Sequence, residues 1–415
     1  MEKMQAFMER FFVPFAAKIN SQRHVAAVRD AFTLSFPLTM AGSMVLLINY
    51  VFLDPTGFVA SLLHLGDLIP NLADYQAVLS SVINGTTNIL AILIAFLVAY
   101  QLAQEMQGDQ VLCGITALAA YFILYPAARN FADKSGSGLM TTYFGAQGLF
   151  VALFVGLFVA ELLTRLGNNK KLVIKMPEQV PPNLSQTFKD VIPFAFSMII
   201  IWLFDYLFRM ATGICFAKGV IQVFQPLFSA ADGYVGLALI YGAMSLFWFI
   251  GVHGPSIVEP AISAALVLNM STNLAAVQAG QHADKVLTLG AQYFVVCLGG
   301  TGATLVICLM FAFLAKSKEL KAIGKASSIP VLFNVNEPFL FGAPIVLNPV
   351  FFVPFIFAPI ANVWLFKIFV DVFNMDGFIY TLPWTTPGPL GIILGCGIKL
   401  LPVIFLVIVL VMDFV

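Results

Sequence analysis

The chain has 415 residues, of which 60% are hydrophobic and only 10% are charged, with 21 basic and 21 acidic side chains and a formal net charge of zero. Soluble domains carry roughly a quarter charged residues, so a soluble fold this apolar could not cover its own surface. The composition therefore predicts a membrane protein. The balanced charge gives no indication of nucleic-acid binding.

Apolar runs long enough to cross a bilayer recur along the chain, since a spanning helix needs roughly 20 apolar residues. The segment 1–29 is amphipathic and too charged to span, so we expect it to lie in the cytoplasmic interface. The predicted spans that follow are 30–53, 82–104, 111–128, 145–164, 191–214, 234–252, 289–315, 346–370 and 391–412.

Lysine and arginine gather in three clusters, within 3–29, 165–189 and 316–325. The positive-inside rule places all three, and with them the N-terminus, in the cytoplasm. An even number of crossings must then separate the second and third clusters, but only three strong spans lie between them. We therefore expect a further crossing within 253–288, which makes about ten transmembrane helices in an all-α polytopic fold.

Two segments are too rich in proline and polar residues to be ordinary spans. They are PSIVEPAISAALVLNM at 255–270 and NVNEPFLFGAPIVLNP at 334–349. Short apolar segments interrupted by proline are typical of broken or re-entrant helices in transporters. Both follow the polar, proline-rich linker 175–190, so we interpret the first part of the chain as a scaffold and the second as a substrate-binding part.

Ionisable residues at membrane depth are costly and mark functional sites. His253 precedes the first irregular segment, which contains Glu259, and the second contains Asn336 and Glu337. An amide, a carboxylate and an imidazole that face one cavity would suit a sugar, because its hydroxyls both donate and accept hydrogen bonds. Glu259 has a simpler interpretation as the partner of a nearby lysine or arginine.

Other polar and aromatic residues give weaker indications. Trp248 and Trp384 could stack on the apolar faces of a sugar, although a lone tryptophan in a membrane protein is more often an interfacial anchor. Gln147 ends a loop that could gate a cavity, and His282 lies in a segment whose simplest interpretation is a solvated loop. GGTGAT at 299–304 lies in an apolar run, where small residues favour close helix packing.

Several kinds of site are not indicated. The four histidines are scattered and the five cysteines form no close pair, so we predict neither a metal site nor a disulfide framework. No Walker motif, dinucleotide fingerprint or Ser-His-Asp pattern is present, which disfavours an ATP-driven pump.

On these residues the chain resembles the enzyme IIC component of the bacterial phosphoenolpyruvate-dependent sugar phosphotransferase system, in its lactose/cellobiose/diacetylchitobiose family. The segments that carry the resemblance are MPEQVPPNLSQTFKDVIPF, PLFSAADGYVG, FWFIGVHGPSIVEPAI, QAGQHADKV, GGTGATL, NEPFLFGAPIVLNP and LPWTTPGPLG. HGPSIVEPA, QAGQHADKV and LPWTTPGPLG are most similar to lactose-type members.

The resemblance implies a homodimer in the bacterial cytoplasmic membrane, with an N-terminal interface domain and a C-terminal substrate domain that moves across the membrane by an elevator-type motion. The domains expected on this basis are an N-terminal segment 1–29, an interface domain 30–175, a linker and fifth helix 176–215, and a substrate domain 216–415. The resemblance also implies two re-entrant hairpins, near 253–270 and 334–349, whose tips meet the sugar.

The chemistry implied is phosphoryl transfer without a cofactor. A IIB phosphocysteine, recharged by enzyme IIA, would phosphorylate the 6-hydroxyl of a disaccharide. Glu337 would be the base, with His253 and Asn336 orienting the sugar. The further candidate contacts are Glu259, Trp248, Trp384, Gln147 and His282. No IIB domain is visible before Val415, so we expect it on a separate protein or on a longer form of this chain.

Two alternatives remain open. The substrate could be cellobiose or N,N'-diacetylchitobiose rather than lactose. A proton-coupled secondary transporter, with Glu337, Glu259 and His253 as a relay, would concentrate unmodified sugar, whereas a phosphotransferase permease accumulates only sugar phosphate. A channel is disfavoured because no filter-forming pattern appears.

Overall fold

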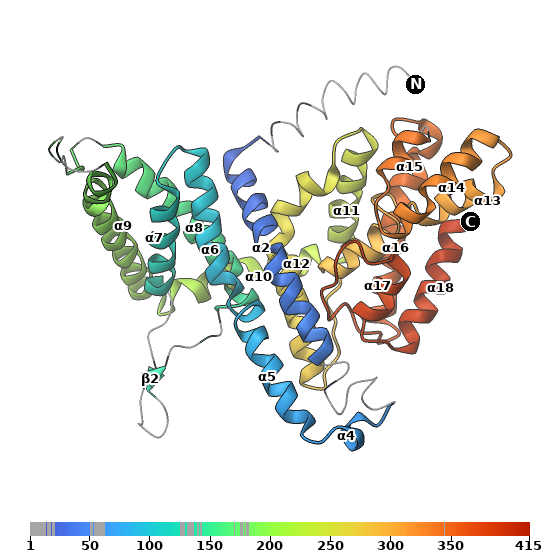
Figure 1. Ribbon diagram of the computed structural model, residues 1–415, viewed down its shortest axis with the longest axis horizontal. Coiled ribbons are helices and arrows are strands. Elements are labelled where there is room, and N and C mark those ends of the chain that lie inside the picture. Colours follow the sequence, from blue (N-terminus) through green and yellow to red (C-terminus); the bar gives the residue numbers. More distant parts are fainter. Residues whose placement is uncertain are drawn as a thin grey trace. The chain divides into compact units, whose positions relative to one another are not determined.

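A computed structural model describes the chain at residues 14, 18, 21–49, 53, 63–124, 129–130, 137–138, 141, 143–169, 171–174, 177, 179, 182–343 and 345–415. These residues form helices and connecting turns, apart from one pairing of two-residue strands, β1 (Arg129–Asn130) with β2 (Ser137–Gly138) (Figure 1). The predicted all-α class is confirmed. The predicted interfacial segment 1–29 and the linker 175–181 lie largely outside the described residues.

By their internal contacts, the residues form two compact units. Unit 1 contains Met40–Ile83 and Leu227–Val415, and unit 2 contains Ser21–Thr39 and Asn84–Pro226. Helix α2 (Arg23–Ile48) belongs to both. The predicted substrate domain begins at 216, at the start of α10 (Phe216–Ala231), whereas the boundary by contacts lies inside that helix, after Pro226.

Unit 2 is built on close packing of small residues. Its helices are α6 (Leu90–Glu105), α7 (Gln110–Leu124), α8 (Leu149–Gly167), α9 (Pro182–Thr212) and most of α10, with short turns η2 (Thr87–Ile89) and η3 (Ala146–Gly148). Ala91, Ala95 and Ala99 recur every four residues on α6 and are fully buried. A Cβ atom at Gly156 of α8 would lie 2.8 Å from the Val98 side chain. Small side chains let these helices approach closely, as in other membrane bundles.

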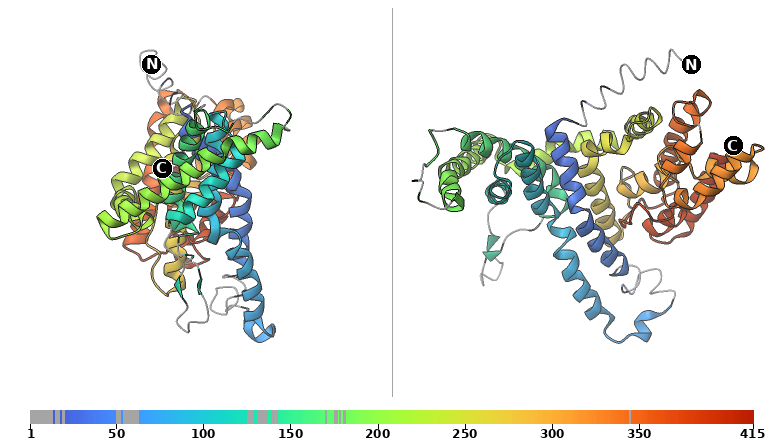
Figure 2. Two further views of the ribbon diagram at one scale, coloured as in Figure 1. Left: turned by 90° about the vertical axis from the view of Figure 1, so that its left-hand side faces the viewer. Right: turned by 45° about the horizontal axis from the view of Figure 1, so that its top comes forward.

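Unit 1 contains the irregular elements. Its helices are α4 (Leu65–Leu68), α5 (Leu72–Asn84), α11 (Tyr234–Phe249), α12 (Gly254–Gln278), the π-helical turn η4 (Ala291–Val296), α13 (Leu305–Leu314), α14 (Lys318–Leu332), α15 (Glu337–Gly342), α16 (Pro349–Asp371), α17 (Gly388–Gly395) and α18 (Leu400–Phe414). The orange helices α13, α14 and α15 lie side by side within this unit (Figures 1 and 2).

Several helices are long and apolar enough to cross a membrane. Among the described residues five stretches qualify: Asp74–Glu105, Ala146–Gly167, Phe188–Thr212, Gly254–Gln278 and Val350–Asp371. Helices α10 and α11, bent by 78° at their junction, make a sixth if they form one broken span. The structure therefore supports a multi-pass membrane protein, while the number of about ten crossings stays a prediction.

The first irregular segment is not broken as predicted. Residues 255–270 lie inside α12, a continuous helix of 25 residues. Pro255 occupies the first turn, where a backbone N–H has no helical partner in any case. Pro260 lies one turn further on and removes a single hydrogen bond, so α12 continues past it.

Two other segments, predicted as continuous spans, are interrupted in the structure. The run 289–315 is split between η4 and α13 by a loop in which Gly299, Gly300 and Gly302 have positive φ. The run 391–412 is split between α17 and α18, where Gly397 and Ile398 have positive φ. Left-handed backbone cannot continue a right-handed helix, so apolar character alone did not predict helix continuity.

Candidate functional site

His253 lies in the tight turn between α11 and α12. A Cβ atom at Gly254 would lie 1.8 Å from the Met244 carbonyl oxygen, so glycine is required where α12 crosses α11. His253 caps α12, its Nδ1 accepting the backbone N–H of Ser256 at 3.2 Å. A neutral imidazole that accepts at Nδ1 carries its proton at Nε2. The exposed His253 ring can therefore donate a hydrogen bond from Nε2 to a ligand.

Trp248 connects this turn to the second irregular segment. Its ring lies 4.9 Å from the His253 ring and 6.2 Å from the ring of Phe341 in α15, in edge-to-face contacts. Such contacts stabilise aromatic pairs beyond simple burial. Because only 6% of Trp248 is exposed, the structure offers little of its face for stacking on a sugar, and its contacts instead hold His253 against α15.

Glu337 opens α15 and is half-buried. It lies in the same short helix as Phe341, whose ring contacts Trp248 beside His253. The backbone after α15 returns to the same place, where the Leu347 N–H donates to the Phe249 carbonyl oxygen at 3.0 Å. Two segments far apart in sequence thus bring an imidazole and a carboxylate together within unit 1.

Asn336 anchors the start of α15 to the glycine loop. Its Nδ2 donates to the Thr301 carbonyl oxygen at 2.8 Å and to Thr304 Oγ1 at 2.9 Å, and the residue is 2% exposed. A Cβ atom at Gly300 would lie 2.2 Å from the Asn336 side chain. In this arrangement the amide nitrogen of Asn336 is used within the protein and positions its neighbour Glu337.

Asn334 is a site residue that the sequence reasoning missed. Its Oδ1 accepts the Gly299 N–H at 3.0 Å, and its Nδ2 donates to the carbonyl oxygens of Trp384 at 2.7 Å and Thr386 at 3.1 Å. It also adopts a left-handed backbone, with φ of 63°. One side chain therefore holds three loops together: 299–304, the turn before α15, and the segment LPWTTPGP. Trp384 in that last segment is 41% exposed, which leaves part of its ring free for contact with a ligand.

Two predicted site residues of unit 1, Glu259 and His282, do not join this group, and Gln147 stays a prediction. Glu259 lies within α12 and accepts hydrogen bonds from Gln292 Nε2, at 3.0 Å, and from the Tyr293 hydroxyl. His282 lies beyond the far end of α12, a helix roughly 37 Å long at 1.5 Å per residue. Gln147 is exposed and belongs to unit 2.

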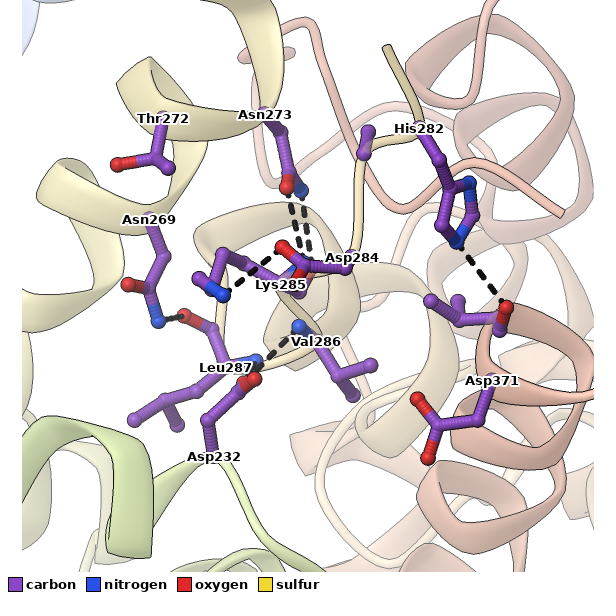
Figure 3. Close-up of polar contacts among 12 residues, drawn as sticks. Asp232, Asn269, Thr272, Asn273, His282, Asp284, Lys285, Val286, Leu287 and Asp371 are labelled. Carbon is purple, nitrogen blue, oxygen red and sulfur yellow. Dashed lines mark hydrogen bonds and ion pairs between the residues drawn. The ribbon is translucent and has the colours of Figure 1, made fainter. Parts of the chain in front are cut away.

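His282 belongs to a different polar region, at the loop 282–288 (Figure 3). Asn273 exchanges two hydrogen bonds with the backbone of Lys285, at 2.8 and 2.9 Å. Asn269 donates to the Leu287 carbonyl oxygen at 2.9 Å, and Asp232 accepts the backbone N–H groups of residues 286 and 287. Side chains outside this loop thus satisfy its backbone in place of helical hydrogen bonds.

Asp376 holds the start of the same loop. It accepts the Ala283 N–H at 2.9 Å and pairs with Lys399 and with His282 Nδ1. Burial alone would raise the pKa of Asp376, but the Ala283 hydrogen bond and the Lys399 charge outweigh it and hold the pKa below its usual value. These groups line a cavity of about 340 Å³. In the described ranges, no group of three or more histidines, cysteines or carboxylates could hold a metal ion.

The apolar helices define a polytopic membrane protein. Unit 1 contains the exposed imidazole of His253, the half-buried carboxylate of Glu337 and the partly exposed indole of Trp384. The chain belongs to the EIIC family of the phosphotransferase system, because residues 29–359 match the family model described as "Phosphotransferase system, EIIC". This confirms the resemblance on which the sequence predictions drew.

Named relatives agree with this family. The lactose-specific EIICB component of the Staphylococcus epidermidis phosphotransferase system is 43% identical over 413 residues, covering 100% of this chain and 69% of its own length. The Staphylococcus aureus counterpart is 41% identical over 425 residues, covering 100% of this chain and 71% of its own. The crystal structure of the transporter ChbC, the IIC component of the N,N'-diacetylchitobiose-specific system, matches with a TM-score of 0.88 at 28% identity, covering 98% of this chain and 95% of ChbC.

Proposed function

We propose that this chain is the permease of a disaccharide phosphotransferase system and that its substrate is lactose. The relatives that are 41–43% identical are lactose-specific, whereas the diacetylchitobiose-specific ChbC is 28% identical. Cellobiose or N,N'-diacetylchitobiose handled by the same mechanism is the second candidate. The observation that carries the proposal is the approach of the segments that carry His253 and Glu337, through the ring contacts of Trp248 with His253 and Phe341 and the Leu347–Phe249 backbone hydrogen bond.

In this proposal the sugar lies against the turn before α12 and the start of α15. His253 Nε2 donates to a sugar oxygen, and the exposed ring of Trp384 stacks on a sugar face. Trp248 and Asn336 position these groups. Glu337 accepts the proton of the 6-hydroxyl while that oxygen attacks the phosphoryl group of a IIB phosphocysteine. The S–P bond breaks, an O–P bond forms and the cysteine leaves as thiolate. Such a transfer depends mainly on positioning and charge stabilisation.

The transport step completes the proposal. The substrate domain of a homodimer carries the sugar inward by an elevator-type motion, with the three basic clusters and the N-terminus in the cytoplasm. There a IIB domain, recharged by IIA, reaches the sugar. About ten crossings and a re-entrant hairpin near 334–349 complete the expected topology. Glu259 and His282 are not assigned to the sugar, because Glu259 is hydrogen-bonded to Gln292 and His282 lies beyond the far end of α12. Gln147 remains a candidate sugar contact from unit 2.

Two measurements test the proposal. Titration calorimetry of the purified chain against lactose, cellobiose and diacetylchitobiose should show the tightest binding for lactose. Glu337→Gln should bind sugar within about tenfold of wild type, which is 1.4 kcal/mol, yet form no sugar phosphate with phosphorylated IIB. Glu319→Gln is the matched control, since Glu319 is exposed on α14.

Contrary results would be equally informative. Normal phosphorylation by Glu337→Gln would remove Glu337 as the base. Uptake of unmodified sugar into liposomes by a proton gradient alone would favour the proton-coupled alternative, for which Glu337, Glu259 and His253 are the available ionisable groups. Tight binding of a β-glucoside or diacetylchitobiose alone would keep the mechanism and change the substrate.

A further inference from the structure

Glu259 is a carboxyl group inside a membrane-length helix, without a positive partner. Its two side-chain hydrogen bonds come from the neutral groups Gln292 Nε2, at 3.0 Å, and the Tyr293 hydroxyl. Within the described ranges no lysine, arginine or histidine forms an ion pair with it. The other titratable groups near this cluster are Tyr241 of α11 and Cys297, neither of which supplies a positive charge. An isolated ionised carboxylate in such surroundings is strongly disfavoured.

The hydrogen bonds of Gln292 indicate which form the carboxyl takes. Gln292 is 1% exposed, and its Oε1 is buried without a hydrogen-bond donor among the described residues. An ionised carboxylate only accepts hydrogen bonds, so it cannot donate one to Gln292 Oε1. A neutral carboxylic acid has one O–H group that can donate. The same amide donates from Nε2 to Glu259 Oε2 at 3.0 Å, so the Glu259 carboxyl is the titratable group hydrogen-bonded to the Gln292 side chain. A proton on Glu259 Oε1 would allow this oxygen to donate a second hydrogen bond, to Gln292 Oε1.

The same arrangement recurs between α16 and α18. Asn362 Nδ2 donates to Asp413 Oδ2 at 3.2 Å, while Asn362 Oδ1 and Asp413 Oδ1 are both buried without a partner in the described chain. An ionised Asp413 has no hydrogen to offer to either oxygen, whereas a proton on Asp413 Oδ1 supplies a donor beside the Asn362 amide. Asp232 differs from both, because its Oδ1 accepts two backbone N–H groups rather than an amide side chain.

We propose that Glu259 and Asp413 are proton-binding sites, each held as a neutral carboxylic acid that donates to the amide oxygen of Gln292 or Asn362. In this step each carboxylate binds one proton from solvent, and no other covalent bond forms or breaks. The two pairs keep α12 and α18 free of charge at these positions, and in each pair the proton adds a second hydrogen bond between two elements to the one observed.

Its pairing with Gln292 gives Glu259 a further role as a positioning residue for the sugar site. This role rests on the proposed function. Helix α12 carries His253 at its start, and Gln292 lies in η4, which leads into the loop that holds Asn336 beside Glu337. The Glu259–Gln292 pair therefore connects the two segments that meet at the sugar.

Infrared difference spectroscopy of the full chain in lipid at neutral pH tests the protonation directly and needs no sugar. Glu259→Gln and Asp413→Asn should each remove one carbonyl band of a protonated carboxylic acid, while the exposed Glu319→Gln should remove none. If neither buried variant removes such a band, the carboxyls are ionised and the proposal fails, whatever the chain transports. If only one variant does, the assignment fails for the other residue.

Sugar affinity tests the positioning role. Glu259→Gln keeps a neutral group that can pair with an amide, so its affinity should stay within about twofold of wild type and be independent of pH between about 6 and 9. Glu259→Leu leaves Gln292 and Tyr293 unpaired and should weaken binding by about tenfold. Equal sugar affinities in the two variants would overturn the positioning role of Glu259. The infrared result would still decide whether Glu259 is protonated. Absence of disaccharide binding in the wild type would refute the proposed function instead.

Discussion

Replacing Asn334 by glycine should loosen the sugar site without altering any side chain assigned to the sugar. The side chain makes three hydrogen bonds, to Gly299, Trp384 and Thr386. Each contributes about 1 kcal/mol net, so their loss costs about 3 kcal/mol. Glycine adopts the left-handed backbone of this position without strain, so the variant isolates the side chain. Asn334→Ala should cost about 1 kcal/mol more, because its Cβ disfavours that backbone.

The assay is sugar affinity measured by calorimetry, with thermal unfolding recorded in parallel. A loss of about 3 kcal/mol shifts the balance between the ordered and displaced loops by roughly 100-fold. Apparent affinity decreases in proportion to the fraction of molecules whose loops are ordered. We therefore expect binding weaker by about tenfold or more. Asn374→Gly is the matched control, since Asn374 is also left-handed but exposed near the His282 cavity. Unchanged affinity and unfolding temperature in Asn334→Gly would refute the view that this side chain supports the site.

Two further outcomes follow from other parts of unit 1. Trp384→Ala should weaken sugar binding, whereas Trp364→Ala, a change at a tryptophan that is also 41% exposed, should leave affinity unchanged; equal effects would point to general destabilisation. The pKa of Asp376 is held below its usual value in the folded chain. Its ionised form therefore contributes fully to the free energy of unfolding above the ordinary carboxyl pKa of about 3.9. That contribution is lost as the pH falls through the lower pKa of the folded state. The unfolding temperature should therefore drop below about pH 4 in wild type and less steeply in Asp376→Asn; parallel curves would contradict this.

The sequence predicted helices well wherever an apolar run was uninterrupted. The predicted spans 145–164 and 191–214 correspond to α8 and α9. Prediction failed where backbone conformation, rather than hydropathy, decided the outcome. Residues 255–270 were expected to break at proline, yet Pro255 lies where a helix tolerates it, and 289–315 was expected to continue through glycines that adopt positive φ.

The site was predictable only in part, for a different reason. His253 and Glu337 stand out because ionisable groups are rare in apolar segments. Asn334 carries no such mark, since its role depends on three loops that meet only in the folded chain. GGTGAT and LPWTTPGP each look unusual in the sequence, but nothing in it indicates that one amide side chain joins them. The signal that could have drawn attention to Asn334 is its position as the first residue of NVNEPFLFGAPIVLNP, the segment already marked as irregular.

The loop 282–288 has a consequence for how this protein tolerates substitution. Its backbone is held by the side chains of Asp232, Asn269, Asn273 and Asp376, all of which lie outside it. Within the loop, Asp284 has a side chain 59% exposed and pairs only with its neighbour Lys285 among the described ion pairs. Natural variation should therefore be tolerated at Asp284 and suppressed at distant positions that never touch a substrate. A catalogue of damaging variants would mark those four residues as functional, although what they preserve is the path of the main chain.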